Sequence, residues 1–126
     1  MLEYFATGWP NEGGLSPEEW EQQMKMAIEG QALGKTVILV SQGSQYDQQR
    51  EEFALGSYLL VNNGSAFFRY TNLNNYEENW SYANQKFDLG IPLGARFQVG
   101  QSWRRNFAKG FVTVDPIART ASITLH

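Results

Sequence analysis

Four consecutive aliphatic residues, Val37 to Val40, lie between two segments that space their apolar residues as helices do, and this alternation constrains the fold most. An unbroken β-branched and aliphatic run is typical of a parallel strand that is covered on both faces. Leu2–Phe5 and Ala66–Tyr70 are further candidate strands, and successive strands begin about thirty residues apart, as in βα units. The first part of the chain is therefore predicted to form a parallel sheet with right-handed crossovers.

The segments between these strands carry start and stop signals of α-helices. Ser16-Pro17-Glu18-Glu19 combines a capping serine, a proline suited to the first helical position and a glutamate that completes a capping box. The apolar stripe of this helix consists of Trp20, Met24, Ala27 and Ile28. Gly34 can end the helix in a left-handed conformation. Asp47 is the expected cap of a second helix, which runs to about Val61 and is stopped by Asn62-Asn63-Gly64.

From Arg96 onward apolar residues alternate with polar ones, which indicates strands rather than helices. The expected strands contain Phe97–Val99, Trp103–Phe107, Phe111–Val114 and Ser122–Leu125. Gly100-Gln101 and Ala108-Lys109-Gly110 are turn signals between them. We therefore expect an antiparallel meander of about four strands. This divides the chain into a partial α/β region, residues 1–86, and a C-terminal antiparallel β region, residues 87–126.

Several motifs in the second region carry a family resemblance. They are Asp88-Leu89-Gly90, Pro92-Leu93-Gly94, Trp103-Arg104-Arg105-Asn106-Phe107 and the run Lys109–Pro116, which reads KGFVTVDP. In this order they resemble the end of bacterial proteins of the hypothetical glycosyl hydrolase family 15 type, which are barrel enzymes that close with a small β-rich tail. The resemblance implies that this chain is the C-terminal part of a glycoside hydrolase. It also implies that the tail itself supplies no catalytic groups.

The fold class that follows is α/β: the last βα units of a (β/α)8-type barrel followed by a small antiparallel β tail. Three strands and two helices cannot close a barrel, which needs eight of each. The opening strand also has no helix before it that would cover its second face. The alternative is a small open α/β sheet that is complete in itself, and the resemblance favours the partial barrel.

Chemistry in a parallel α/β sheet is expected at the carboxyl ends of the strands. The segments that would follow the three strands, residues 6–12, 41–46 and 71–82, are rich in amides, hydroxyls and aromatic rings. This mixture suits a sugar, whose hydroxyls need donors and acceptors and whose C–H face packs on a ring. Trp9, Tyr76 and Trp80 are the predicted substrate-binding residues. Packing of these loops against the rim of the sheet is the alternative role.

Glycoside hydrolysis generally uses two carboxyl groups. Glu3 is the predicted catalytic residue, because it lies on a predicted strand and because the resemblance implies an acidic residue in such a strand. The alternative for Glu3 is an ion pair with Arg or Lys inside the sheet. No second carboxylate has a convincing position, and Glu12, Glu77 and Glu78 are expected to be solvated loop charges.

Composition and charge argue against several other classes of function. The net charge of −3 argues against nucleic acid as a partner, and no apolar run approaches the length that spans a bilayer. The chain has no cysteine, its single histidine is the last residue, and no dinucleotide or phosphate-loop motif is present. We therefore expect no cofactor and no metal site. The polar and aromatic loops and the family resemblance imply a carbohydrate partner, and the exposed edges of an incomplete sheet imply possible self-association. A non-catalytic carbohydrate-binding or interaction module, or an inactive fragment, is the alternative to a hydrolase.

Overall fold

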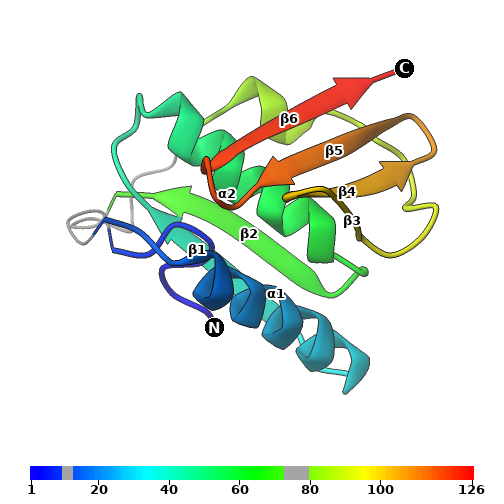
Figure 1. The fold of residues 1–126 in the computed structure, drawn as a ribbon, viewed down its shortest axis with the longest axis horizontal. Coiled ribbons are helices and arrows are strands. Elements are labelled where there is room, and N and C mark those ends of the chain that lie inside the picture. Colours follow the sequence, from blue (N-terminus) through cyan, green and yellow to red (C-terminus); the bar gives the residue numbers. More distant parts are fainter. Residues whose placement is uncertain (10–12, 73–79) are drawn as a thin grey trace.

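Two separate sheets organise the chain in the computed structural model, which describes residues 1–9, 13–72 and 80–126 (Figure 1). The first half contains α1 (Pro17–Ala32), β1 (Val37–Gln42), α2 (Gln48–Val61) and β2 (Ala66–Thr71). A short 3-10 helix, η1 (Ala83–Lys86), leads to the second sheet. That sheet contains β3 (Phe97–Val99), β4 (Ser102–Phe107), β5 (Gly110–Asp115) and β6 (Thr120–Leu125). The two predicted helices, the strands near residues 37 and 66 and the predicted meander are therefore present.

The first sheet contains two parallel strands, β1 and β2, with Val37 opposite Ala66 and Gln42 opposite Thr71. Leu2 adds one parallel bridge to Leu39 and is not part of a longer strand. The chain turns directly afterwards, with positive φ angles of 58° at Tyr4 and 63° at Ala6. These left-handed conformations break the two-residue alternation that a strand requires. The predicted strand Leu2–Phe5 is therefore reduced to a single bridge followed by a turn.

The second sheet is an antiparallel meander in the order β3-β4-β5-β6, as the alternation of residues predicted. Its buried residues lie at every second position of β5, where Val112 and Val114 are fully buried. These two side chains point toward α2, because a Cβ added to Gly56 of α2 would lie 3.0 Å from Val114 and 3.5 Å from Val112. The antiparallel sheet thus packs on α2 through one apolar face.

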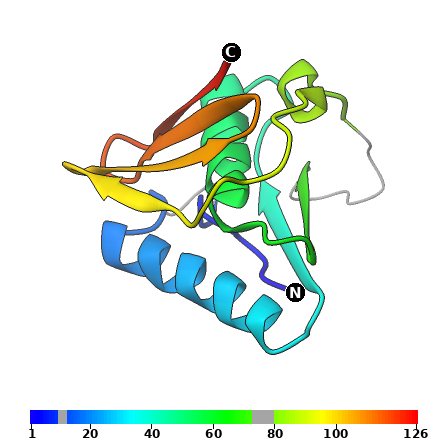
Figure 2. The same cartoon turned by 90° about the vertical axis from the view of Figure 1, so that its right-hand side faces the viewer.

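The prediction of barrel-closing βα units is wrong. The described part of the chain contains two α-helices, a two-stranded parallel sheet and a four-stranded antiparallel sheet. Figure 2 shows α2 between the two sheets, with α1 and α2 on the same side of β1 and β2. In a barrel the helices form the outer ring and keep one face in water. Here α2 is covered on two sides, so its buried residues surround the helix: Glu51, Phe53, Ala54, Leu55, Gly56, Ser57, Leu60 and Val61.

The other face of the parallel sheet is only partly covered. Ile38 and Phe67 are register partners on this face and are 45% and 59% exposed. The run Val37–Val40 was predicted to be covered on both faces, and the exposure of Ile38 corrects that expectation. The continuous hydrophobic core lies instead around α2, and it includes residues from both sheets, such as Leu39 and Val112.

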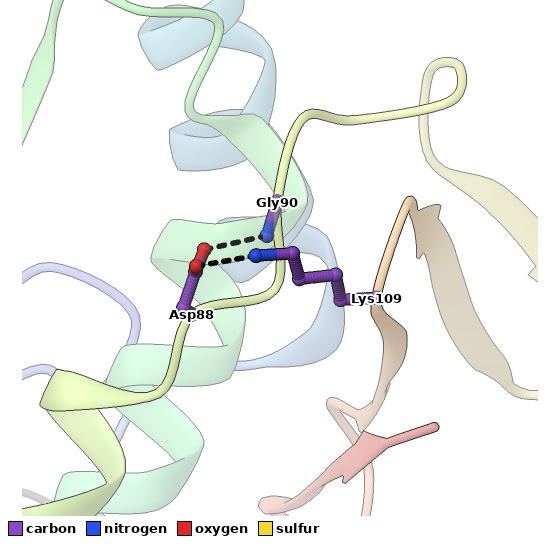
Figure 3. Close-up of polar contacts among 3 residues, drawn as sticks. All are labelled: Asp88, Gly90 and Lys109. Atoms are coloured by element: carbon purple, nitrogen blue, oxygen red, sulfur yellow. Dashed lines mark hydrogen bonds and ion pairs between the residues drawn. The ribbon is translucent and has the colours of Figure 1, made fainter.

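Two motifs of the family resemblance meet in space. The carboxylate of Asp88 accepts a hydrogen bond from the backbone N–H of Gly90 at 3.0 Å and forms an ion pair with Nζ of Lys109 at 2.7 Å (Figure 3). The side chains of Asp88 and Lys109 are mostly exposed, and the Lys109 interaction lowers the pKa of Asp88. The backbone N–H of Lys109 also donates to the carbonyl of Leu89. The motif at residues 88–90 therefore fastens the segment before β3 to the turn between β4 and β5.

Candidate functional site

The carboxyl ends of β1 and β2 lie side by side, where Gln42 and Thr71 are register partners and both are fully buried. The chain segment after the Leu2 bridge reaches the same place, because Arg50 of α2 joins the two. Its Nε donates to the carbonyl of Gln42 at 2.7 Å, and its Nη2 donates to the carbonyl of Gly8 at 2.8 Å. The described beginnings of the segments that follow the three predicted strands therefore gather at one end of the sheet.

Arg50 is placed by the start of α2. The side chain of Asp47 accepts a hydrogen bond from the backbone N–H of Arg50 and caps the helix, as the sequence predicted. Burial lowers the pKa of Arg50, while the nearby Tyr70 and Asp47 act in the opposite direction. A guanidinium stays charged under all ordinary conditions, so Arg50 supplies a fixed positive charge at the end of the sheet.

Tyr70 comes from β2 and passes over Gly43. Its hydroxyl donates to the carbonyl of Ser44 at 2.9 Å, and burial raises its pKa. A Cβ at Gly43 would overlap the Tyr70 hydroxyl and lie 2.7 Å from Cδ of Arg50. Glycine is thus required at residue 43 because two side chains cross its backbone there.

Two further rings surround Tyr70. The centroids of Trp80 and Tyr82 each lie 5.8 Å from the centroid of Tyr70, and the Tyr82 ring meets Tyr70 edge to face. The hydroxyl of Tyr82 donates to the carbonyl of Gln45 at 2.6 Å, and burial raises its pKa to about 12. Trp80 and Tyr82 are half-buried, so part of each ring faces the surface. We call Arg50, Tyr70, Trp80 and Tyr82 the strand-end cluster.

A buried carboxyl group on α2 binds the chain segment that follows Trp80 and Tyr82 of the strand-end cluster. Glu51 is 1% exposed, and its carboxylate accepts hydrogen bonds from Asn84 at 2.6 Å and Gln85 at 3.0 Å. Burial raises the pKa of Glu51, and the two amide hydrogen bonds oppose this effect in part. Because Asn84 and Gln85 belong to η1, Glu51 fastens the segment that carries Trp80 and Tyr82 to α2.

The predicted binding residues have different outcomes. Trp80 belongs to the strand-end cluster, whereas Tyr76 lies outside the described residues. Trp9 is 37% exposed and its ring lies 3.9 Å from the ring of Tyr4, next to the Gly8 carbonyl that accepts from Arg50. Glu3 is exposed and lies in the turn after Leu2, not on a strand. The catalytic role predicted for Glu3 stays a prediction.

The sequence analysis missed Arg50 and Glu51. Charged residues in the first turn of a helix are usually solvated, so the sequence around Arg50 and Glu51 indicates no functional role for them. One signal was present for Glu51: it lies four residues before the apolar Leu55, which is 4% exposed, and therefore on the same side of the helix. A carboxyl group on the apolar side of a helix indicates burial with hydrogen-bond partners.

A cavity of about 380 Å³ adjoins the strand-end cluster. Its lining includes Thr7, Gly14, Asp47, Gln49, Arg50 and Arg119. Over residues 1–9, 13–72 and 80–126, no group of three or more His, Asp or Glu side chains is arranged to hold a metal ion. No helix in those same ranges is long and apolar enough to cross a membrane.

Comparison with known proteins gives one family. A family model described as "Hypothetical glycosyl hydrolase family 15" matches residues 1–111. No curated protein matches the chain. The matched residues include both helices, the parallel sheet, β3 and β4. This agrees with the resemblance carried by the motifs around residues 88–116. The chain belongs to the hypothetical glycosyl hydrolase family 15.

Proposed function

We propose that the carboxyl ends of β1 and β2 bind the carbohydrate on which a glycoside hydrolase of this family acts. The observation that carries the proposal is the position of Trp80 beside Tyr70, over strand ends where backbone and side-chain polar groups meet. A half-buried indole next to hydrogen-bonding groups matches a sugar, which presents one apolar face and a rim of hydroxyls.

The groups near Trp80 include the hydrogen-bonding groups and the aromatic surface that a sugar requires. Arg50 offers N–H donors, and the exposed Ser44 offers a hydroxyl. Trp9 presents a second partly exposed ring, held against Tyr4 beside the Gly8 carbonyl. Aromatic rings near hydrogen-bonding groups suit a sugar, whose C–H face packs on a ring while its hydroxyls pair with donors and acceptors. We include Trp9, Tyr76 and Trp80 in the proposed binding surface.

Catalysis by the chain itself is the finer part of the proposal. Retaining and inverting glycosidases need two carboxyl groups, about 5 Å apart or roughly 6.5–9.5 Å apart. Glu3 is our proposed catalytic carboxyl group. Glu51 is a positioning residue, because both of its oxygens accept hydrogen bonds from amide side chains of η1.

A non-catalytic carbohydrate-binding module is the second candidate function. This function is favoured because the carboxylates near the strand-end cluster already accept structural hydrogen bonds. Glu51 accepts from the two amide side chains of η1, and Asp47 caps α2 with one of its oxygens. A chain that binds but does not hydrolyse needs the rings and donors of the strand-end cluster and no carboxyl pair.

Affinity electrophoresis of the full chain in gels that contain soluble polysaccharides tests binding. We expect one class of polysaccharide to retard the chain, and Trp80→Ala to weaken that binding about tenfold. Phe97→Ala is the matched control, because Phe97 is an exposed ring of 42% on β3 in the other sheet. Binding that survives Trp80→Ala and Trp9→Ala together would contradict the proposed site.

Release of reducing ends from the retained polysaccharide separates the two functions. A glycoside hydrolase loses this activity in Glu3→Gln while its binding persists. Binding without any release in the wild-type chain supports the non-catalytic module.

A further inference from the structure

The cavity beside the strand-end cluster is built from three separate segments of the chain. The segment before α1 supplies Gly14, the N-terminal end of α2 with its cap supplies Arg50 and Asp47, and the turn between β5 and β6 supplies Arg119. Its volume of about 380 Å³ lies within the range of small-molecule sites, which is about 300–1,000 Å³. The antiparallel sheet thus contributes a charged side chain to the end of the parallel sheet.

Two guanidinium groups line this one cavity. Arg119 donates through Nη2 to the carbonyl of Leu15 at 3.2 Å, and Arg50 donates to the carbonyls of Gln42 and Gly8. These acceptors are neutral. Within the described part of the chain, neither guanidinium lies within ion-pair distance of a carboxylate, since the ion pairs there join Arg96 to Glu21 and Lys109 to Asp88. The cavity therefore brings together two guanidinium groups, and the Asp47 carboxylate acts on Arg50 there from beyond ion-pair distance.

Arg119 is exposed, and its guanidinium contacts the backbone of the segment before α1. Its φ angle is 59°, a left-handed conformation that an arginine rarely adopts. A Cβ added to Gly14 would lie 2.9 Å from Cζ of Arg119, so the guanidinium rests against the bare backbone of Gly14. Gln49 also donates to the carbonyl of Arg119 at 3.3 Å. The side chain of Arg119 thus lines the cavity next to Gly14.

The remaining polar groups of the cavity suit hydroxyls. Asp47 uses Oδ1 to cap α2, and a carboxylate has further lone pairs that accept from a hydroxyl. Its negative charge opposes the binding of a phosphate dianion. A sugar that carries one carboxylate matches both kinds of charged group in the cavity. Its carboxylate pairs with the two arginines, and its hydroxyls donate to Asp47.

We infer that this cavity binds a uronate-type sugar unit, with its carboxylate between Arg50 and Arg119, and that the carbohydrate of the adjoining site is acidic. This inference rests on the proposed function for the presence of a carbohydrate and adds its chemical class. Arg119 lies beyond the matched residues 1–111, so the family match does not determine this specificity.

The test compares uronate oligosaccharides with neutral hexose oligosaccharides of the same length and linkage, titrated into the full chain by calorimetry. We expect the uronates to bind at least about tenfold more tightly, and the preference to shrink as salt is raised from low to high concentration. Arg119→Gln should weaken uronate binding about tenfold and leave the binding of the neutral sugar unchanged. Arg119→Lys, which keeps the charge, should restore part of the preference.

Lys35→Gln is the matched control, because it removes one positive charge from an exposed residue between α1 and β1, where it does not line the cavity. Equal binding of uronate and neutral oligosaccharides would overturn the acidic preference and leave the proposed function standing. A preference that Arg119→Gln and Lys35→Gln reduce equally would overturn the assignment to this cavity. Failure of every oligosaccharide to bind would overturn the inference together with the proposed function.

Discussion

Nη1 of Arg105, on β4, lies 2.7 Å from the carbonyl oxygen of Asn62 at the end of α2. The same guanidinium also donates to the Leu59 carbonyl and, through Nη2, to the Asn63 side chain at 2.7 Å. A helix leaves its last carbonyls without partners and carries partial negative charge at that end. Arg105, which is 4% exposed, supplies hydrogen-bond donors to these carbonyls and a positive charge beside the negative end of the helix. It thereby joins the antiparallel sheet to α2.

Replacement of Arg105 by methionine should therefore destabilise the whole chain. The methionine fills similar space but leaves several buried carbonyl groups without a donor, and we expect a loss of about 3 kcal/mol in the free energy of unfolding. Urea unfolding followed by circular dichroism measures this loss. Arg104→Met is the control, because the neighbouring side chain packs over Phe111 and should cost less than about 1 kcal/mol. Similar losses in the two variants would contradict this role of Arg105.

Gly56 allows α2 to approach the antiparallel sheet. A Cβ there would lie 2.7 Å from Cβ of Ala121, so Gly56→Ala must push β6 away from the helix. The gain in helix propensity is about 1 kcal/mol, and overpacking costs about 1–3 kcal/mol, so we expect net destabilisation in thermal unfolding. Gly94→Ala has open space around the new methyl group and should change stability by less than about 0.5 kcal/mol. A stabilised Gly56→Ala variant would show that the two layers are not in close contact.

The buried carboxyl group of Glu51 should make stability depend on pH. Burial raises its pKa in the folded chain, so its contribution is complete below the ordinary pKa of a glutamate and is lost as pH rises through the folded value. The measurement is the free energy of unfolding of the wild type minus that of Glu51→Gln, determined across this pH window. We expect the difference to become less favourable to the wild type as pH rises. A difference that is constant or of opposite sign would show that hydrogen bonds from Asn84 and Gln85 dominate over burial.

Local elements could be predicted because their signals lie within a few residues of each other. The capping box at α1 is present, with the Ser16 side chain accepting from the Glu19 N–H at 3.1 Å and the Glu19 side chain accepting from the Ser16 N–H at 3.0 Å. The cap at Asp47 and the alternation in β4 and β5 are equally local. Such patterns fix the type of element before any packing is known.

The arrangement of these elements could not be predicted in the same way. A βαβ order is consistent with a barrel, but the second buried side of α2 depends on residues such as Gly56 and Val114, which lie far apart in the sequence. The reading of Leu2–Phe5 as a strand failed because Tyr4 and Ala6 adopt positive φ angles, which nothing in these residue types indicates. Local periodicity reports which faces are apolar and does not identify what covers them.

The candidate site was predictable in place and only partly in its members. Trp80 was expected at the end of a strand because the polar and aromatic loop follows β2 directly. Arg50 was missed because its role requires the carbonyls of Gln42 and Gly8, which only the tertiary fold brings together. A similar long-range contact, from Asn84 and Gln85, defines the role of Glu51.

The four tryptophans permit the most direct test of carbohydrate binding at the strand ends. Each indole N–H gives its own cross-peak in a nitrogen–proton correlation spectrum, assigned by single replacements with phenylalanine. Trp20 is an internal reference, since its Nε1 donates to Ser57 at 3.0 Å inside the core, and Trp103 lies under Arg96 in the other sheet. During titration with the retained oligosaccharide we predict saturable shifts of the Trp9 and Trp80 peaks while those of Trp20 and Trp103 stay in place. Shifts confined to Trp103, or a saturated complex in which the Trp9 and Trp80 peaks have not moved, would contradict the account.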